Sequence, residues 1–192
     1  MKKLVFIVLA MATIISCTKE KETESNPLMA NLKNDINAMH SNYQYFSFAT
    51  GDTVPFSDSL TTNWDVAFKG TSVIFNSGIS GIGNAGVIIM DTLFSEVTIA
   101  PEAGYAQDNA TSKAIPTGGG NGWYSYAGPP SHLISPIAGK VFVVRTAKGK
   151  YAKFEFINYY KGAPALPDGL TDVSGYYTIR YIYQPDGSTK LQ

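Results

Sequence analysis

The stretch that decides the fold class is KVFVVRTAKGKYAKFEFINYY, residues 140–160. Two runs rich in β-branched and aromatic residues flank Ala147-Lys148-Gly149-Lys150, and a glycine in so short a link is typical of a tight antiparallel turn. The run Val141-Phe142-Val143-Val144 is apolar at every position, so we expect this strand to be buried on both faces. The stretch therefore predicts a β-hairpin at the centre of a sheet.

Similar short runs recur from Ser41 onward, separated by Gly, Pro, Asn and Asp. We expect strands near Tyr43–Ala49, Trp64–Lys69, Ser72–Asn76, Gly86–Met90, Trp123–Tyr126, Lys140–Thr146, Tyr151–Tyr160 and Tyr176–Gln184. In the last run, apolar positions alternate with Thr178 and Arg180, which predicts one wetter face. Because no strand is followed by a long helical pattern, the chain disfavours parallel βαβ units. We predict an all-β domain, either an antiparallel β-sandwich or a partly open barrel.

One segment breaks this pattern. Leu28, Met29, Leu32, Ile36 and Met39 recur at spacings of three and four, which is the period of an amphipathic helix. We expect one or two helical turns there.

The N-terminus has the pattern of a targeting segment. Lys2 and Lys3 precede an apolar run, Leu4–Ile15, that is too short to span a bilayer as a helix. The sequence Ile14-Ile15-Ser16-Cys17 resembles a bacterial lipobox, in which the cysteine thiol becomes a thioether to diacylglycerol. The alternative is an ordinary signal peptide with a chance cysteine.

We therefore predict a lipoprotein signal peptide in residues 1–16, a flexible tether in 17–27 and a single all-β domain in 28–192. The fatty chains on Cys17 would anchor the protein to the membrane, since each buried CH₂ contributes roughly 0.8 kcal/mol. Cys17-Thr18-Lys19-Glu20 also resembles the signal that sends some outer-membrane lipoproteins to the cell surface, although a plain solvated linker explains it equally well.

Composition excludes several classes of site. Cys17 is the only cysteine, so the mature chain has no internal disulfide and no thiolate metal site. Lys and Arg number 15 against 15 acidic residues, and loss of the signal peptide brings the net charge to about −2. Without a basic stripe to neutralise phosphates, nucleic acid is not expected as a partner.

Two glycine-rich stretches imitate nucleotide-binding loops. Gly81-Ile82-Gly83-Asn84-Ala85-Gly86 matches G-x-G-x-x-G, but it leads into a strand-forming run, whereas the nucleotide site needs a helix there. We expect a turn. Gly118–Gly122 lacks the Lys-Ser or Lys-Thr of a phosphate loop, and it predicts either a flexible lip beside the following aromatic residues or a loose loop.

Catalytic motifs are absent from the sequence. It has no G-x-S-x-G nucleophile elbow, no H-E-x-x-H and no carboxylate cluster with metal spacing. We therefore expect a binding protein and not an enzyme. His132, in the proline-stiffened loop Gly128–His132, is either an iron or other metal ligand or a solvated loop residue.

Read together, several stretches resemble the HmuY-type haem-binding lipoproteins. The matching pieces occur in the family's order and are Tyr45-Phe46-Ser47-Phe48 with Gly51, Asn63–Phe68, Asn76-Ser77-Gly78 with Gly81, Gly122-Trp123, Lys140–Arg145 with Gly149 and Ala152-Lys153, and Tyr177–Tyr181. The resemblance implies an all-β fold, a surface or outer-membrane lipoprotein, and haem held between loops on one side. It also implies as partners haem or a haem-carrying host protein and an outer-membrane receptor.

The resemblance fails at the iron ligands. The family's axial pair is two His or two Met, yet the two corresponding stretches, Tyr124–Gly128 and Tyr105–Gly122, contain neither residue type. If haem binds, the site must be rebuilt from Trp123, Tyr124, Tyr126, His132 or Met90, and tyrosine is known as a haem ligand. Met90, at a strand end, is otherwise core filler. The alternative function is a surface lipoprotein of the same fold that binds a glycan, a peptide or a partner protein.

Overall fold

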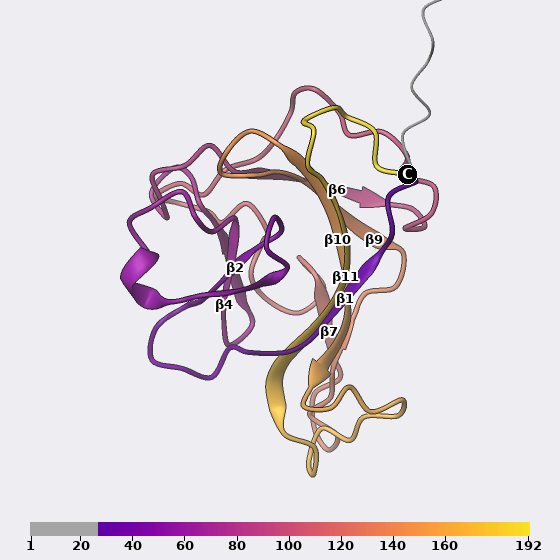
Figure 1. Cartoon of the computed structure of the whole chain (residues 1–192). Helices are drawn as coiled ribbons and strands as arrows, with labels where there is room; N and C mark the ends of the chain where they lie inside the picture. Colours follow the sequence, from indigo (N-terminus) through magenta and orange to yellow (C-terminus); the bar gives the residue numbers. More distant parts are fainter. Residues whose placement is uncertain (1–26) are drawn as a thin grey trace, which may run out of the picture.

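The computed structural model describes residues 27–192, so the predicted signal peptide, the predicted lipidation site Cys17 and nearly all of the predicted tether lie outside the described residues. The regular secondary structure of the described chain consists of antiparallel strands, apart from one short 3-10 turn, η1 (Phe56–Asp58) (Figure 1). The predicted all-β class is confirmed, and the sheets do not close into a barrel.

The larger sheet has five strands in the order β1-β11-β10-β9-β6. Their bounds are β1 (Asn31–Asn37), β6 (Gly86–Asp91), β9 (Lys140–Arg145), β10 (Tyr151–Tyr160) and β11 (Ser174–Gln184). The predicted hairpin is confirmed, since Arg145 of β9 pairs with Tyr151 of β10 across the turn. All four residues Val141 to Val144 are buried, as their sequence predicts.

The second sheet has four strands in the order β3-β2-β4-β5. It contains β2 (Gln44–Ser47), β3 (Asp52–Val54), β4 (Val66–Lys69) and β5 (Ser72–Phe75). A separate two-stranded hairpin, β7 (Tyr124–Tyr126) and β8 (Ile134–Pro136), lies at the lower end of the molecule in Figure 1.

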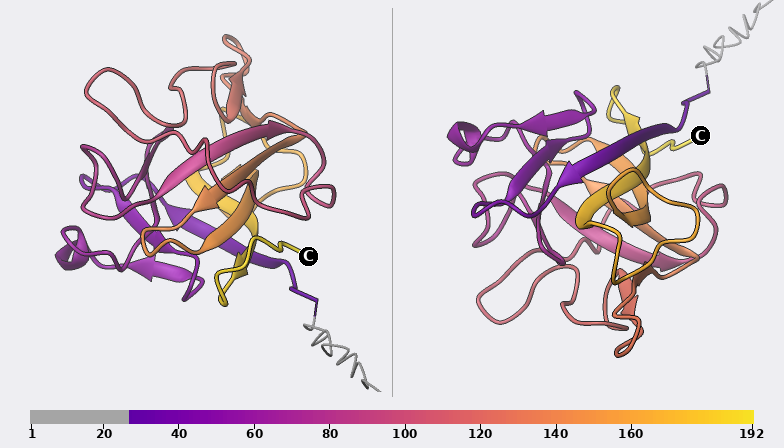
Figure 2. Two further views of the ribbon diagram at one scale, coloured as in Figure 1. Left: turned by 90° about the horizontal axis from the view of Figure 1, so that it is seen from above. Right: turned by 90° about the horizontal axis from the view of Figure 1, so that it is seen from below.

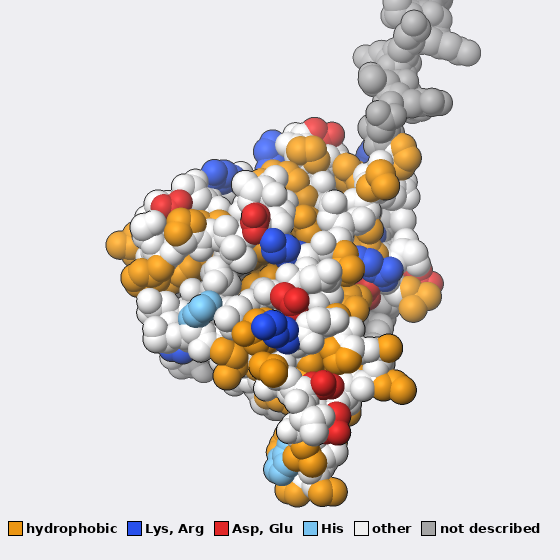
Figure 3. All heavy atoms as spheres, turned by 60° about the horizontal axis from the view of Figure 1, so that its bottom comes forward, with side chains coloured by type: hydrophobic (Ala, Val, Ile, Leu, Met, Phe, Trp, Pro, Cys, Tyr) orange, Lys and Arg blue, Asp and Glu red, His pale blue; other side chains and the backbone are white. Residues whose placement is uncertain are grey.

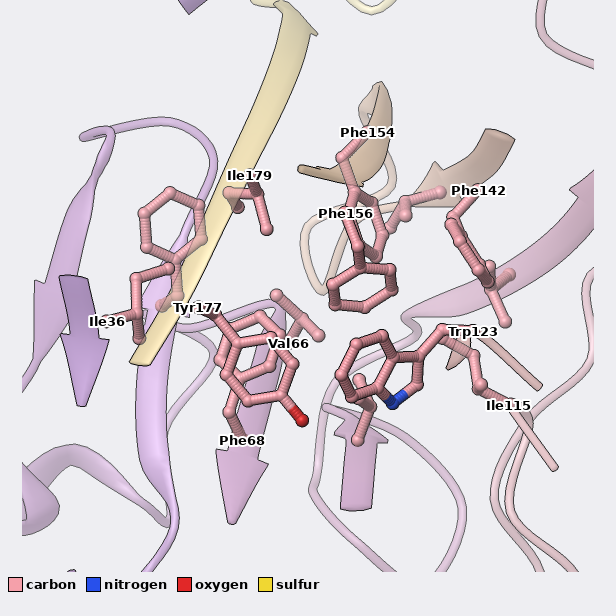
Figure 4. Packing of buried hydrophobic residues seen from close by; sticks show 14 of the residues in the cluster. Ile36, Val66, Phe68, Ile115, Trp123, Phe142, Phe154, Phe156, Tyr177 and Ile179 are labelled. Carbon is pink, nitrogen blue, oxygen red and sulfur yellow. The ribbon is translucent and has the colours of Figure 1, made fainter. Parts of the chain in front are cut away.

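The main core lies between the two large sheets and is mostly aromatic. Phe68 from the smaller sheet packs against Phe156 and Tyr177 from the larger one (Figure 4), and Phe46 and Phe154 belong to the same cluster. Ring centroids of Phe68 and Tyr177 are 4.7 Å apart, and aromatic pairs at such separations add about 0.5–1.5 kcal/mol beyond their area burial. This packing makes the domain a sandwich without any disulfide.

Two buried carboxylates connect the layers. Asp65 accepts hydrogen bonds from the backbone N–H of Phe48 and of Ala147, both at 2.9 Å, so it joins the smaller sheet to the β9–β10 turn. Burial raises the pKa of the Asp65 carboxyl, although these two N–H donors and Lys148 act in the opposite direction. Asp108 accepts from Phe75 and Ala114 in the same way and fixes the long β6–β7 connection.

The predicted helix over Leu28–Met39 is wrong. The segment forms β1, an edge strand paired with β11. Ile36 is buried, but Leu32 remains 58% exposed, so the apolar spacing does not mark one buried face. Asp35, with φ of 52°, accompanies a shift in pairing register between Lys33 and Ile36.

Two smaller differences concern strands, and one prediction about a turn is confirmed. The structure adds β3 and β8, which the sequence did not predict. The wetter face predicted for the last strand is limited to Arg180, because Thr178 and Ile182 are buried beneath other segments. The loop Gly81–Ala85 leads into β6 and not into a helix, which confirms the predicted turn.

Candidate functional site

Trp123 belongs to the core and not to a surface pocket. Its side chain is 1% exposed, its indole N–H donates to the carbonyl oxygen of Thr71 at 2.9 Å, and its ring lies 4.6 Å from that of Phe156 (Figure 4). Tyr124 is also buried, with its ring 4.8 Å from the Trp123 ring. Burial raises the pKa of the neighbouring Tyr159 to about 12, which reflects how dry this aromatic cluster is. Trp123 and Tyr124 are therefore core residues beneath the surface and not part of an exposed site.

Met90 lies away from the other candidates. It pairs with Val141 and packs in a second cluster on the outer face of the five-stranded sheet, with Phe94, Val97 and Leu191. Its neighbour Ile89 points to the main core. The structure therefore does not bring Met90 together with Tyr126 or His132.

Tyr126 and His132 do come together. Tyr126 is the last residue of β7 and is 48% exposed, and His132 stands in the loop that leads to β8. The Tyr126 hydroxyl shares a hydrogen bond with Nδ1 of His132, and the two ring centroids are 6.0 Å apart. Because Nδ1 is engaged, Nε2 is the atom of His132 that is available to a metal.

The backbone fixes this pair. The His132 N–H donates to the carbonyl of Gly128 at 2.9 Å, and Ala127 donates to Leu133 at 2.9 Å, which closes the tight loop. His132 has a positive φ of 51°, an uncommon conformation for a residue other than glycine. At the base of the hairpin, Ile134 donates its N–H to the hydroxyl of Tyr160 at 2.9 Å, so the hairpin is held on the core.

An apolar groove lies beside the pair. It has a volume of about 370 Å³ and is lined by residues of both the β7–β8 loop and the β10–β11 loop. Its lining residues are Pro130, Ser131, Leu133, Pro167, Asp168, Gly169 and Leu170. Leu170 and the adjacent Leu166 are 68% and 92% exposed. We name this end of the molecule, residues 126–133 and 166–170, the tip.

Gly169 sets the width of the tip. A Cβ atom added there would lie 2.3 Å from the carbonyl oxygen of Ser131 and 2.8 Å from the carbonyl carbon of His132. The two loops therefore touch through their backbones, at a place that only glycine allows. No sequence pattern predicts this contact, because its partners are far apart along the chain.

The glycine-rich stretch Gly118–Gly122 packs against β7. The N–H of Gly120 donates to the carbonyl of Tyr124 at 2.7 Å, and a Cβ on Gly119 would lie 3.1 Å from the Cβ of Tyr126. The stretch therefore lies beside Tyr126 of the tip, while the other aromatic residues that follow it, Trp123 and Tyr124, are buried.

A second cavity lies apart from the tip. It has a volume of about 410 Å³ and is lined by Ala38, Met39, His40, Tyr43, Lys69, Gly70 and Ser72. Figure 3 is turned so that the lower end of Figure 1 comes forward. It shows the two histidines of the chain, in pale blue, as separate side chains. Sequence reasoning did not select Met39 or His40, because nothing along the chain marked the cavity around them.

The described chain lacks two further features. Residues 27–192 hold no group of three His, Cys, Asp or Glu side chains placed to bind a metal ion. Over the same residues, no helix has the length and apolar character needed to cross a membrane.

Comparison with known proteins identifies relatives. The family model HmuY, described as HmuY protein, matches residues 39–181. The solved structures of similar fold include the apo HmuY analogue of Tannerella forsythia, which is 17% identical, covers 84% of this chain and 99% of its own, and gives a TM-score of 0.55. None of the curated proteins matches the sequence of this chain.

Two Bacteroides proteins share the fold to a similar degree. One, from Bacteroides vulgatus, is assigned as an HmuY-like haem-binding protein. It is 20% identical to this chain, the match covers 80% of this chain and 91% of that one, and the TM-score is 0.52. The other, from Bacteroides fragilis, is assigned as a lipoprotein; it is 16% identical, with coverage of 81% and 91% and a TM-score of 0.53.

Proposed function

Because this chain belongs to the HmuY family, we propose that it binds haem without catalysing a reaction, as a lipid-anchored protein of the outer membrane or cell surface that serves haem uptake. The observation that carries the proposal is the Tyr126–His132 pair beside the apolar groove of the tip. Within residues 27–192, no other exposed histidine forms a hydrogen bond between a ring nitrogen and an aromatic hydroxyl.

The tip offers one histidine and an apolar surface that could serve a haem group. Histidine is a common axial ligand of haem iron, and a ligating His is usually oriented by a hydrogen bond to its other ring nitrogen. In this chain Tyr126 would supply that orienting bond and Nε2 of His132 would face the iron. The prolines and leucines of the groove would cover part of the porphyrin, and 370 Å³ falls within the roughly 300–1,000 Å³ of small-molecule pockets.

The position of the tip suits a protein anchored at its N-terminus. Residue 27, where the described chain begins, lies close to the C-terminus at the upper end of Figure 1, whereas the tip lies at the lower end (Figures 1 and 2). Leu28 packs in the same cluster as Leu191, which fixes the first described residues there. A lipid on Cys17 would therefore attach at the end of the domain opposite the tip, which leaves the tip accessible to a haem-carrying host protein or an outer-membrane receptor.

Titration of the full chain with haemin tests the haem proposal. We expect a saturable shift of the Soret band, weaker or absent with iron-free protoporphyrin. His132→Ala should abolish that preference for iron, whereas His40→Ala, which changes the other histidine, should leave it unchanged. If haemin gives no saturable spectral change, the proposal fails.

Anchoring is tested separately. A Cys17→Ala chain expressed in a bacterium with the lipoprotein pathway should remain unprocessed and take up no labelled fatty acid. Normal labelling of that variant would refute lipidation at Cys17. Protease treatment of intact cells would then show whether the wild-type domain faces outward.

One observation favours a second function. Leu166, Leu170 and Val173 are exposed together on the β10–β11 loop, and apolar side chains gathered in this way are typical of a surface that binds a peptide or a partner protein. Loss of peptide or protein binding on Leu170→Ser, in a chain that does not bind haemin, would support this alternative.

A further inference from the structure

The cavity of about 410 Å³ lies where the link between β1 and β2 meets the turn between β4 and β5. Its walls come from residues 38–43 of the link and residues 69–72 at the turn. The two segments are joined directly, because Gly70 donates its N–H to the carbonyl of Ala38 at 2.8 Å. The hydroxyl of Tyr177, a core residue of β11, donates to the carbonyl of Gly70 at 2.8 Å. The folded sheets therefore hold the cavity in shape.

Lys69 brings to this cavity a positive charge that no carboxylate neutralises within residues 27–192. Its Nζ donates to the carbonyl oxygen of Ser41, which ties the ammonium group to the other segment that lines the cavity. An ammonium group has three N–H donors, so two remain for a bound molecule. The ion pairs of the described chain use other cations, namely Lys33, Lys140 and Arg180.

The remaining lining of the cavity contains no acidic side chain. His40, Tyr43 and Ser72 supply an imidazole and two hydroxyls. Burial, with the charge of Asp108, raises the pKa of the Tyr43 phenol, although its hydrogen bond with Ser72 acts in the opposite direction. The Tyr43 hydroxyl therefore stays protonated and can donate. Asp108 is buried and does not line the cavity, and its two carboxylate oxygens accept backbone N–H groups.

Met39 gives the cavity an apolar side. Its side chain is 60% exposed, and a Cβ added to Gly175 would lie 2.3 Å from its sulfur, so the thioether packs on β11 at that glycine. The ring of Tyr43 packs against the cluster that contains Trp64. Methionine side chains adapt to the shape of a bound molecule. A ligand can therefore place an apolar body on Met39 while its charged group meets Lys69.

We propose that this cavity is a second ligand site of the protein and that it binds a small organic carboxylate. Lys69 binds the carboxylate through charge-assisted hydrogen bonds, which are roughly twice as strong as neutral ones. The hydroxyls of Tyr43 and Ser72 add neutral hydrogen bonds, and Met39 covers the apolar body. A single lysine matches one negative charge, whereas a phosphate carries nearly two. The volume falls within the roughly 300–1,000 Å³ of small-molecule pockets.

The site goes beyond the haem function and does not depend on it. The cavity shares no lining residue with the groove of the tip. Haemin binding at the tip is followed by the Soret band, whereas occupation of this cavity is followed by the amide signals of residues 38–43 and 69–72. Loss of one therefore leaves the other measurable.

Benzoate is the probe, because it joins one carboxylate to a flat apolar ring. We expect it to cause saturable nuclear magnetic resonance shifts in the ¹⁵N-labelled full chain, confined to residues 38–43 and 69–72. Benzamide has the same shape without the charge and should bind about tenfold or more weakly. Inorganic phosphate should not saturate the same signals. Equal binding of benzamide, or saturation by phosphate but not by benzoate, would overturn the carboxylate site.

Substitutions of Lys69 test its role. Lys69→Met should weaken benzoate binding about tenfold or more, whereas Lys69→Arg, which keeps the charge, should retain binding. Lys148→Met is the matched control, since Lys148 is an exposed lysine that donates to the neutral side chain of Asn63, and it should leave binding unchanged. Unchanged circular dichroism of each variant would show that the fold is kept. Absence of saturable shifts with benzoate, or equal affinity in Lys69→Met and wild type, would refute the proposal.

Discussion

Asp65→Ala should destabilise the domain more than the substitution of any exposed charged residue does. The substitution leaves two buried backbone N–H groups, those of Phe48 and Ala147, without their acceptor. Each such group costs about 1–3 kcal/mol. Relief of the buried carboxylate, whose pKa burial raises, offsets part of this cost, so we expect a net loss of about 2–4 kcal/mol. That is a large share of the roughly 5–15 kcal/mol by which domains are stable.

Urea denaturation of the full chain, followed by tryptophan fluorescence, measures the loss. Asp52→Ala is the control, because Asp52 lies at the surface and pairs with Lys33, and exposed pairs contribute at most about 1 kcal/mol. Asp65→Asn should fall between the two, since its amide oxygen can accept one N–H while its NH₂ opposes the other. A loss below about 1 kcal/mol for Asp65→Ala, or one equal to that of Asp52→Ala, would refute the reasoning.

Three further predictions concern the core, the tip and pH. Val143→Asp should unfold or aggregate the domain, because an unpaired buried charge costs several kcal/mol, whereas Ile157→Asp on the exposed side of β10 should remain folded in circular dichroism. Gly169→Ala should push the two loops of the tip apart, at about 1–3 kcal/mol, and weaken haemin binding, whereas Leu166→Ala in the same loop should do neither. Burial, aided by Arg180, lowers the pKa of Lys153 below 10.5, so folding disfavours the protonated lysine. As the pH rises through that lowered pKa, the wild type should therefore gain stability relative to Lys153→Met.

The hairpin of β9 and β10 was predictable because its signals are local. The Lys148-Gly149 turn and the apolar run before it lie within one stretch of chain, and both act on their immediate neighbours. The edge strand β1 was not, because its apolar residues imitate a helical period while its conformation is decided by pairing with β11 at the other end of the chain. Long-range pairing overrides a local periodicity of this kind.

The candidate site was predictable only as a set of residue types. Tyr126 and His132 could be selected as donors on a loop, but the bond between them depends on the turn that closes at Gly128. Trp123 and Tyr124 next to a glycine run suggested an aromatic wall, yet the start of β7 directs both into the core. The contact of Gly169 with the His132 loop joins segments that no sequence pattern connects.

The core and the tip are built from separate parts of the chain. The aromatic core and the buried carboxylates Asp65 and Asp108 hold the sheets together without any contribution from the exposed pair Tyr126 and His132. Substitutions at an exposed loop change stability little, usually within about 0.5 kcal/mol. Solved structures that are only 16–20% identical to this chain keep the same sandwich fold. The proposed haem ligand can therefore differ from the His or Met pair that the family resemblance implies without loss of the fold.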